Sequence, residues 1–263
     1  MARTHSRNRM YLFFLGVLPW IVSATALVAG FIQWQTPALY PWAWLLVIAL
    51  YGAAAWVIGG KRLPIAERLE RLATPVVTLL SVGGLWLLSE STWALIVLTC
   101  FFSGLLWISL QLMYLVNHES SRYPVNGLSR FHVACVPVTG FAMGVLGLGL
   151  RVFVGVSFAW LALGFSVIGA VLYLATSHPV ATDEQRRLWV FAGAGIGFLL
   201  ALLVTYLPTS VSVSGAFCAL LLTMPIRARR YLYQPYPTRN MTFVELALFV
   251  LLFIIFLVGA RWT

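Results

Sequence analysis

Long uncharged apolar runs recur along the whole sequence, and they constrain the fold more than any other feature. Most approach the roughly 20 residues that an α-helix needs to cross the hydrocarbon core of a bilayer. Because hydrocarbon offers no hydrogen-bond partner to a free peptide group, a chain crosses it only as helices or as a closed β-barrel. Barrel strands would alternate apolar and polar residues, and these runs do not alternate. The pattern therefore predicts an all-α, polytopic transmembrane helix bundle.

The composition supports this prediction. Of the 263 residues, 61% are apolar and 9% are charged, and the mean hydropathy is +0.93. In ordinary soluble domains about a quarter of the residues are charged. The class of soluble enzymes is therefore excluded, as are disordered chains and disulfide-stapled secreted scaffolds. No stretch resembles a linker between soluble domains, so we expect residues 1–263 to form a single integral membrane domain.

Nine apolar runs are considered as spans. Two of them, 131–150 and 152–176, form one stretch that is too long for a single crossing, and Arg151 among nearby glycines predicts a tight hairpin between them. Runs 74–89 and 210–226 are short, and one of them could be re-entrant, so eight spans is the alternative. No short repeat is evident, and an inverted repeat of four plus one plus four runs stays open. The remaining runs are 10–33, 38–59, 92–116, 188–207 and 242–261.

Basic residues test this count, because Lys and Arg near the ends of spans are retained on the cytoplasmic side. With the N-terminus in the cytoplasm, the even-numbered connections should carry the cations. All but two of the 17 Lys and Arg residues lie before the first run or in these connections, and the exceptions are Arg151 and Arg261. The alternation supports nine spans with a cytoplasmic N-terminus, in a plasma or inner membrane.

The second connection, 61–72, has the pattern of a short amphipathic helix. Ile65 and Leu69 share one face, and Glu67 can pair with Arg71 one turn later. We expect this helix to lie along the inner membrane surface. A simple charged elbow is the alternative.

Small residues mark the runs that we expect to pack most closely, because they allow helix backbones to approach each other within lipid. Two pairs are spaced four residues apart, and two more glycines lie in the sixth run. These residues are Gly140 with Gly144, Gly193 with Gly197, and Gly164 and Gly169.

The most distinctive polar segment, 227–239, interleaves arginines with tyrosines. Guanidinium groups match phosphate oxygens, and tyrosines favour the headgroup level, so we expect contact with anionic membrane lipid or a phosphorylated polyprenyl carrier on the cytoplasmic side. Two prolines, at 235 and 237, favour a semi-extended backbone. The alternatives are an acidic surface of a membrane-protein partner, or a role in orientation alone. The predicted binding residues are Arg227, Arg229, Arg230, Tyr231, Tyr233 and Arg239. The net charge of +10 comes from connections too short for a nucleic-acid-binding domain.

A few polar residues lie within the apolar runs, where they are costly and often functional. Thr99, Ser103 and Gln111 lie in the fourth run, and Glu245 lies one turn into the ninth. These four side chains could line a cavity. The alternatives are hydrogen bonds between neighbouring helices and, for Glu245, pairing with a nearby arginine.

No residue pattern indicates a catalytic group, a cofactor or a metal ion. The three cysteines are isolated within apolar runs, and the four histidines include no pair at i, i+4. The only lysine, Lys61, lies in a connection, which excludes a retinal Schiff base inside the bundle.

Three functional hypotheses remain. The first is a non-catalytic subunit or scaffold that packs against membrane proteins or anionic lipid. The second is a transporter or flippase for an apolar or lipid-linked substrate, which would need the polar cavity. The third is an enzyme acting on a lipid phosphate, which would need His118, Glu119, His178 and Asp183 to converge with the arginines of 227–239 at the inner surface.

Overall fold

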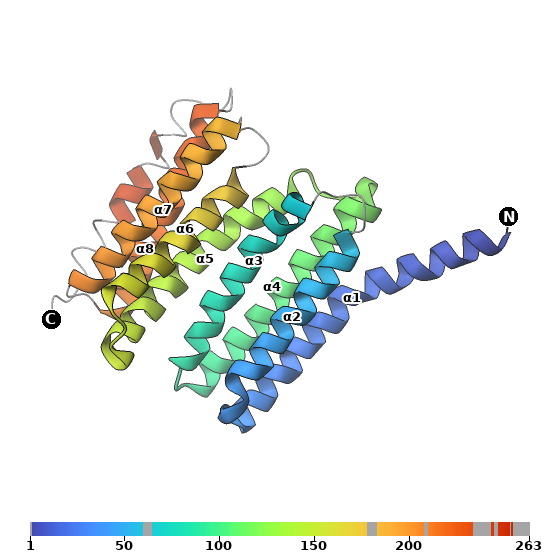
Figure 1. The fold of residues 1–263 in the computed structure, drawn as a ribbon, viewed down its shortest axis with the longest axis horizontal. Coiled ribbons are helices and arrows are strands. Elements are labelled where there is room, and N and C mark those ends of the chain that lie inside the picture. The colour runs from blue at the N-terminus through green and yellow to red at the C-terminus, as the bar shows by residue number, and fades with distance from the viewer. Residues whose placement is uncertain are drawn as a thin grey trace. The chain divides into compact units, whose positions relative to one another are not determined.

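The computed structural model describes residues 2–59, 65–177, 183–207, 210–233, 243–244, 247–252 and 254. Within these ranges the regular elements are all helices, which confirms the predicted all-α class (Figure 1). The eight α-helices that can be delimited are α1 (Ala2–Gln35), α2 (Tyr40–Gly59), α3 (Ile65–Leu87), α4 (Thr92–His118), α5 (Gly127–Gly149), α6 (Phe158–Thr176), α7 (Asp183–Tyr206) and α8 (Val211–Tyr233).

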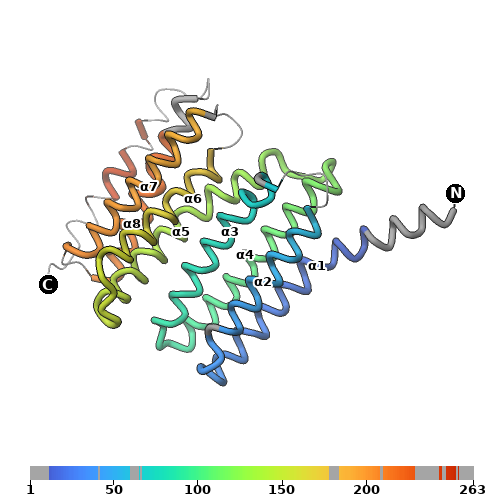
Figure 2. The backbone as a smooth tube through the Cα atoms, in the orientation of Figure 1, coloured from blue at the N-terminus to red at the C-terminus, as the bar shows by residue number. Residues whose placement is uncertain are grey.

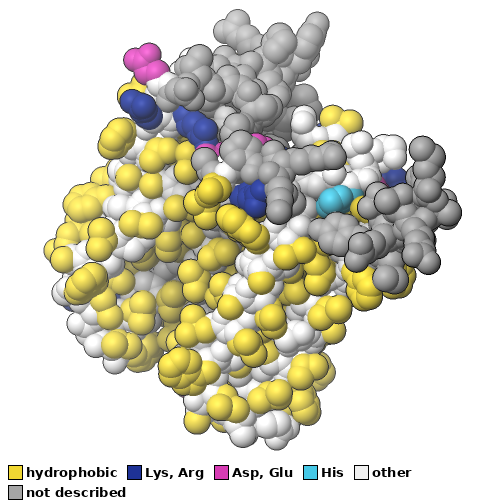
Figure 3. Space-filling model, turned by 45° about the vertical axis from the view of Figure 1, so that its right-hand side comes forward, with side chains coloured by type: hydrophobic (Ala, Val, Ile, Leu, Met, Phe, Trp, Pro, Cys, Tyr) yellow, Lys and Arg dark blue, Asp and Glu magenta, His cyan; other side chains and the backbone are white. Residues whose placement is uncertain are grey.

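Seven stretches within these helices are long and apolar enough to cross a membrane, so the chain has the build of a multi-pass membrane protein. Large apolar side chains such as Trp42, Trp160 and Phe191 are at least 70% exposed, which suits a surface that faces lipid. On the face in Figure 3, apolar side chains cover long stretches of the molecule. The seven stretches are Leu12–Gln35, Trp42–Gly59, Thr92–His118, Gly127–Val154, Phe158–Thr176, Glu184–Tyr206 and Val211–Ala228.

The two other predicted spans have different outcomes. Run 74–89 is the C-terminal part of α3, which is not among the seven. The amphipathic helix predicted for 61–72 does not end before this run but continues into it, and its Glu67–Arg71 ion pair is confirmed at 2.6 Å. Run 242–261 lies mostly outside the described residues. A count of nine spans and a cytoplasmic N-terminus therefore stay predictions.

Three reporter fusions test whether α3 crosses the membrane. Among the described residues, α3 and all but the last two residues of α4 lie between Gly59 and Val116, so reporters fused after these two residues are expected to report the same compartment. A fusion after Ser89, between the two helices, should report the opposite one. Alkaline phosphatase and a fluorescent protein, which are active on opposite sides of a bacterial inner membrane, provide the measurement. Opposite compartments after Gly59 and Val116 would show that α3 does not cross.

The predicted hairpin at Arg151 is confirmed. After α5 the chain makes one π-helical turn, Leu150–Val154, and Gly155 then adopts the left-handed conformation at φ 71°. Glycine suits this position because it has no Cβ to clash there. The guanidinium of Arg151 donates a hydrogen bond to the carbonyl of Val156 at 3.1 Å and so closes the turn.

The chain divides into two compact units, Met1–Phe131 and His132–Thr263. In the first unit, α1 packs along α2 and α4, and α3 packs against both of these helices. In the second unit, α6 packs along α7, and both contact α8 (Figure 2). Each unit has buried apolar residues of its own, with Tyr51 and Leu106 in the first and Leu172 and Leu222 in the second. That residues 1–263 form a single membrane domain stays a prediction.

Glycines allow α5 and α8 to approach closely, as their spacing predicted. A Cβ atom added to Gly140 would lie 2.8 Å from the Cα atom of Ala219. One added to Gly144 would lie 2.5 Å from the carbonyl oxygen of Ser214. Such distances exclude a side chain, so these two positions require glycine.

The contact between α6 and α7 is also made by glycines. A Cβ atom on Gly193 would lie 2.7 Å from the Cβ atom of Tyr173, and one on Gly169 or Gly197 would collide with a backbone carbonyl of the facing helix. Gly164 was predicted to belong to this group, but a Cβ atom there would meet nothing within 4 Å. The prediction for Gly164 is wrong because its side of α6 faces open space.

Candidate functional site

Two of the residues predicted to line a cavity, Thr99 and Ser103, lie at the contact between α1 and α4. The hydroxyl oxygens of Ser103 and Ser23 are 2.6 Å apart, and the Ser103 hydroxyl lies 2.9 Å from the Ser23 carbonyl oxygen. The side chain of Thr99 contacts Gly30 of α1, where an added Cβ atom would lie 2.7 Å from the threonine oxygen. These contacts correspond to the alternative, hydrogen bonding and packing between neighbouring helices.

Of the other two residues of the predicted cavity, Gln111 is the one that the structure describes. Gln111 lies two turns beyond Ser103 on α4, and its Oε1 atom is buried with no hydrogen-bond partner in the described part of the chain. Glu245 lies outside the described residues. A cavity lined by all four side chains therefore stays a prediction.

A buried hydrogen bond that the sequence did not indicate links α2 to α4. The hydroxyl oxygens of Tyr51 and Ser109 are 2.7 Å apart, and neither residue is exposed. The apolar run that contains Tyr51 gave no sign of this partner, because the two residues are 58 positions apart.

The Tyr51–Ser109 bond gives a measurable prediction. In membrane proteins such a hydrogen bond contributes about 0.6 kcal/mol on average and at most about 1.7 kcal/mol. We expect Tyr51→Phe and Ser109→Ala each to lower the free energy of unfolding by an amount in this range. The double variant should cost less than the sum of the two. Unfolding in mixed micelles measures all three, and strictly additive losses would show that the bond contributes nothing.

The arginine- and tyrosine-rich segment 227–239 begins inside a helix. α8 continues to Tyr233, so Arg227, Arg229, Arg230, Tyr231 and Tyr233 lie on helical backbone. The semi-extended backbone predicted for this part is wrong, because prolines at 235 and 237 restrict only the residues next to them. The side chain of Arg227 is exposed, whereas the side chains from Arg229 onward and all of Arg239 lie outside the described parts. Lipid contact here stays a prediction.

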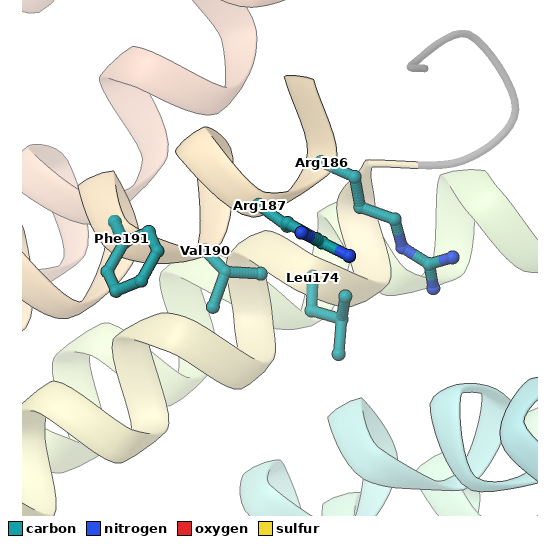
Figure 4. Close-up of a pocket in the computed structure, with 5 residues that line it drawn as sticks. All are labelled: Leu174, Arg186, Arg187, Val190 and Phe191. Carbon is teal, nitrogen blue, oxygen red and sulfur yellow. The ribbon is translucent and has the colours of Figure 1, made fainter. Parts of the chain in front are cut away.

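A pocket of about 450 Å³ lies where α6 ends and α7 begins. Leu174 of α6 lines it together with Arg186, Arg187, Val190 and Phe191 of α7. Figure 4 shows the arginine side chains toward one end of the pocket and the ring of Phe191 at the other. We call these five residues the arginine pocket.

Helical spacing explains the two-part character of the arginine pocket. Arg186 and Val190 are four residues apart on α7, as are Arg187 and Phe191, so each arginine lies one turn before an apolar residue on the same face. Long helical side chains lean toward the helix N-terminus, which carries the arginines away from the apolar run. The pocket therefore has a cationic end and an apolar wall.

This arrangement suits an amphiphilic anion. Guanidinium groups are planar forks that bind phosphate oxygens through paired hydrogen bonds. The side chain of Arg187 is exposed and forms no ion pair with a described residue. Phe191 is 73% exposed and Val190 half-buried, so an acyl chain can lie against both. A lipid with a phosphate headgroup would contact both ends of the pocket.

Sequence reasoning used Arg186 and Arg187 only for orientation and placed the lipid site at 227–239. A local signal did exist, since each arginine of the pair is followed four residues later by an apolar side chain at the start of a span. The sequence could not indicate Leu174, which reaches the pocket from the preceding helix.

Two of the residues that the enzyme hypothesis needs, His118 and Glu119, have described side chains, and each has a polar partner within the protein. Glu119 accepts hydrogen bonds from the Tyr114 hydroxyl at 3.1 Å and from Arg122 at 3.3 Å. The Nε2 atom of His118 lies 3.0 Å from the carbonyl oxygen of Ile58. His178 and the side chain of Asp183 lie outside the described parts, so their convergence stays untested.

The described residues include no group of three or more His, Cys, Asp and Glu side chains that could hold a metal ion. The chain matches no known family model, no curated protein and no solved structure. The proposed function therefore rests on the membrane-length helices and the arginine pocket.

Proposed function

We propose that this protein is a non-catalytic membrane subunit or scaffold that binds an anionic, phosphate-bearing lipid in the arginine pocket. The observation that carries the proposal is the pairing of two guanidinium groups with an apolar wall at the end of a membrane-crossing helix. In a plasma or inner membrane with the predicted orientation, this end lies at the headgroup level of the cytoplasmic leaflet. Anionic lipids are concentrated there, and each nearby arginine contributes about 1 kcal/mol of attraction.

Hydrogen bonds that side chains make between neighbouring helices in the first unit favour a scaffold over a transporter. The hydroxyl of Ser103 bonds to α1, and that of Tyr51 bonds to Ser109 on α4. Hydroxyls that join helices hold them in one arrangement, whereas a transported substrate needs polar groups facing a cavity. A bound lipid at the helix ends would then anchor the bundle at the membrane surface.

Lipid retention by the purified full-length protein tests the proposal. Native mass spectrometry from mild detergent is performed after addition of phosphatidylglycerol or phosphatidylcholine with the same acyl chains. We expect phosphatidylglycerol to be retained at a lower concentration, and inorganic phosphate at the same concentration to leave it bound, because phosphate lacks the acyl chains. Equal retention of the two lipids would overturn the proposal. Displacement of the lipid by equimolar phosphate would show a site for free phosphate instead.

A further inference from the structure

The helices of the two units occur in the same order and at nearly constant spacing. α2 and α6 begin at Tyr40 and Phe158, which are 118 residues apart, and the first described residues of α3 and α7, Ile65 and Asp183, are also 118 apart. The first residues of α4 and α8, Thr92 and Val211, are 119 apart. Three successive helices of the two units therefore share nearly one spacing.

The first helix of each unit fits the same spacing. α1 contains Pro19 and α5 contains Pro137, again 118 residues apart. α1 ends at Gln35, and the π-helical turn that completes α5 ends at Val154, 119 residues later. Both units also have a close contact between their first and last helices. Gly30 meets Thr99 in the first unit, and Gly140 meets Ala219 in the second.

We propose that the chain consists of two tandem copies of one four-helix unit, and that the arginine pocket has a counterpart in the first copy that Trp56 fills. This inference rests on the proposed function, in which the arginine pocket of the second copy binds a phosphate-bearing lipid. The order of helices is parallel rather than inverted. The ninth run would then follow the second copy instead of separating the copies.

A four-helix copy explains the distribution of charge. If all four helices cross, the chain returns to the side on which it started, so corresponding connections of both copies face the same compartment. Basic residues mark the passage from the second to the third helix in both copies, because Lys61 and Arg62 follow α2 while Arg186 and Arg187 lie near the start of α7. The segments that follow α4 and α8 also contain arginines. A repeated four-helix unit therefore gives both copies the same orientation in the membrane, with the basic residues of each copy on the cytoplasmic side.

The counterpart of the pocket is found by position. Leu174 lies 16 residues after the start of α6, and Trp56 lies 16 residues after the start of α2. Arg186 lies three residues after the start of α7, and Arg68 lies three residues after the start of α3. Trp56 and Arg68 therefore occupy in the first copy the places that Leu174 and Arg186 occupy in the second.

The two copies differ in what lies beside the shared arginine. In the first copy the guanidinium carbon of Arg68 lies 4.8 Å from the centre of the Trp56 ring, a cation–π contact. In the second copy the smaller Leu174 leaves a pocket beside Arg186. Residue 187 is arginine, whereas its counterpart is Leu69. The indole therefore takes the place of the lipid, and the residue at positions 56 and 174 decides whether the copy binds one.

Exchanging these residues tests the inference. Leu174→Trp should place an indole beside Arg186 and lower the apparent affinity for phosphatidylglycerol about tenfold, a change of about 1.4 kcal/mol. Leu163→Trp is the matched control, because Leu163 is 56% exposed on the same helix and does not line the pocket. The reciprocal variant, Trp56→Leu with Leu69→Arg, should bind a second phosphatidylglycerol molecule. Native mass spectrometry counts the lipids in each case.

The outcomes separate the two proposals. If the native protein binds one phosphatidylglycerol molecule but Leu174→Trp retains it as well as Leu163→Trp does, the role of this position is wrong and the lipid site stands. The same holds if the folded reciprocal variant binds only one lipid. If the native protein does not prefer phosphatidylglycerol at all, the proposed function fails. Should the reciprocal variant not fold, the Leu174→Trp result decides alone.

Discussion

The double variant Arg186→Gln/Arg187→Gln is expected to bind phosphatidylglycerol about 30-fold more weakly than the native protein, since each arginine near an anionic headgroup contributes about 1 kcal/mol and 1.4 kcal/mol is a factor of ten. Glutamine keeps much of the side chain's length and polarity but removes the charge and the guanidinium fork. Both arginines lie before Gly193 and Gly197 on α7, so their loss should leave the close contacts that these glycines make with α6 in place. Titration with phosphatidylglycerol, followed by native mass spectrometry, gives the affinity.

A variant of equal charge separates a specific site from general attraction. Arg122→Gln/Arg130→Gln also removes two exposed arginines from a connection that is predicted to be cytoplasmic. If the arginine pocket is the site, this control should retain nearly native affinity. Equal losses in both double variants would indicate that the membrane surface responds only to net charge, and the pocket would lose its proposed role.

Replacing Gly197 by valine should destabilise the protein more than any other single substitution proposed here. A Cβ atom at this position would collide with the backbone carbonyl of Phe165, which cannot move away as a flexible side chain could. Overpacked sites typically cost about 1–3 kcal/mol, and a backbone collision lies at or above the upper end. We expect a lower unfolding temperature in detergent, followed by fluorescence-detected size-exclusion chromatography.

Gly195 provides the control for this substitution on the same helix. A Cβ atom on Gly195 would meet nothing within 4 Å, so Gly195→Val changes helix propensity and apolarity without a collision. The Gly197 variant should also bind phosphatidylglycerol more weakly, because the contact between α6 and α7 brings Leu174 beside Arg186 and Arg187. Equal unfolding temperatures for the two valine variants would show that the close contact does not stabilise the fold.

Much of the fold could be predicted from the sequence because its causes are local. Seven of the nine apolar runs correspond to membrane-length stretches, the hairpin occurs at Arg151, and Glu67 pairs with Arg71 one turn away. Each of these features depends on residues within a few turns of one another. The merger of 61–72 with the following run was missed because an amphipathic helix and an apolar one can join without any local signal.

The candidate site was harder to predict because it depends on which helices meet. The sequence marks both 227–239 and the Arg186–Arg187 pair as basic, and it cannot say which of them adjoins an apolar wall. Leu174 enters the pocket only because α6 turns back along α7. The repeat was missed for a related reason, since the two copies share helix positions but few residues.

The sequence by itself determined that the chain crosses a membrane as helices, because the hydrophobic cost of exposed apolar runs and the need to satisfy every peptide group leave no other outcome. The tertiary structure decided which small residues face a neighbour, so that Gly197 is fixed against Phe165 while Gly164 and Gly195 are not. It also decided which arginine adjoins an indole and which adjoins a pocket. Apolarity is a property of single residues, whereas a close contact or a pocket exists only between residues that packing brings together.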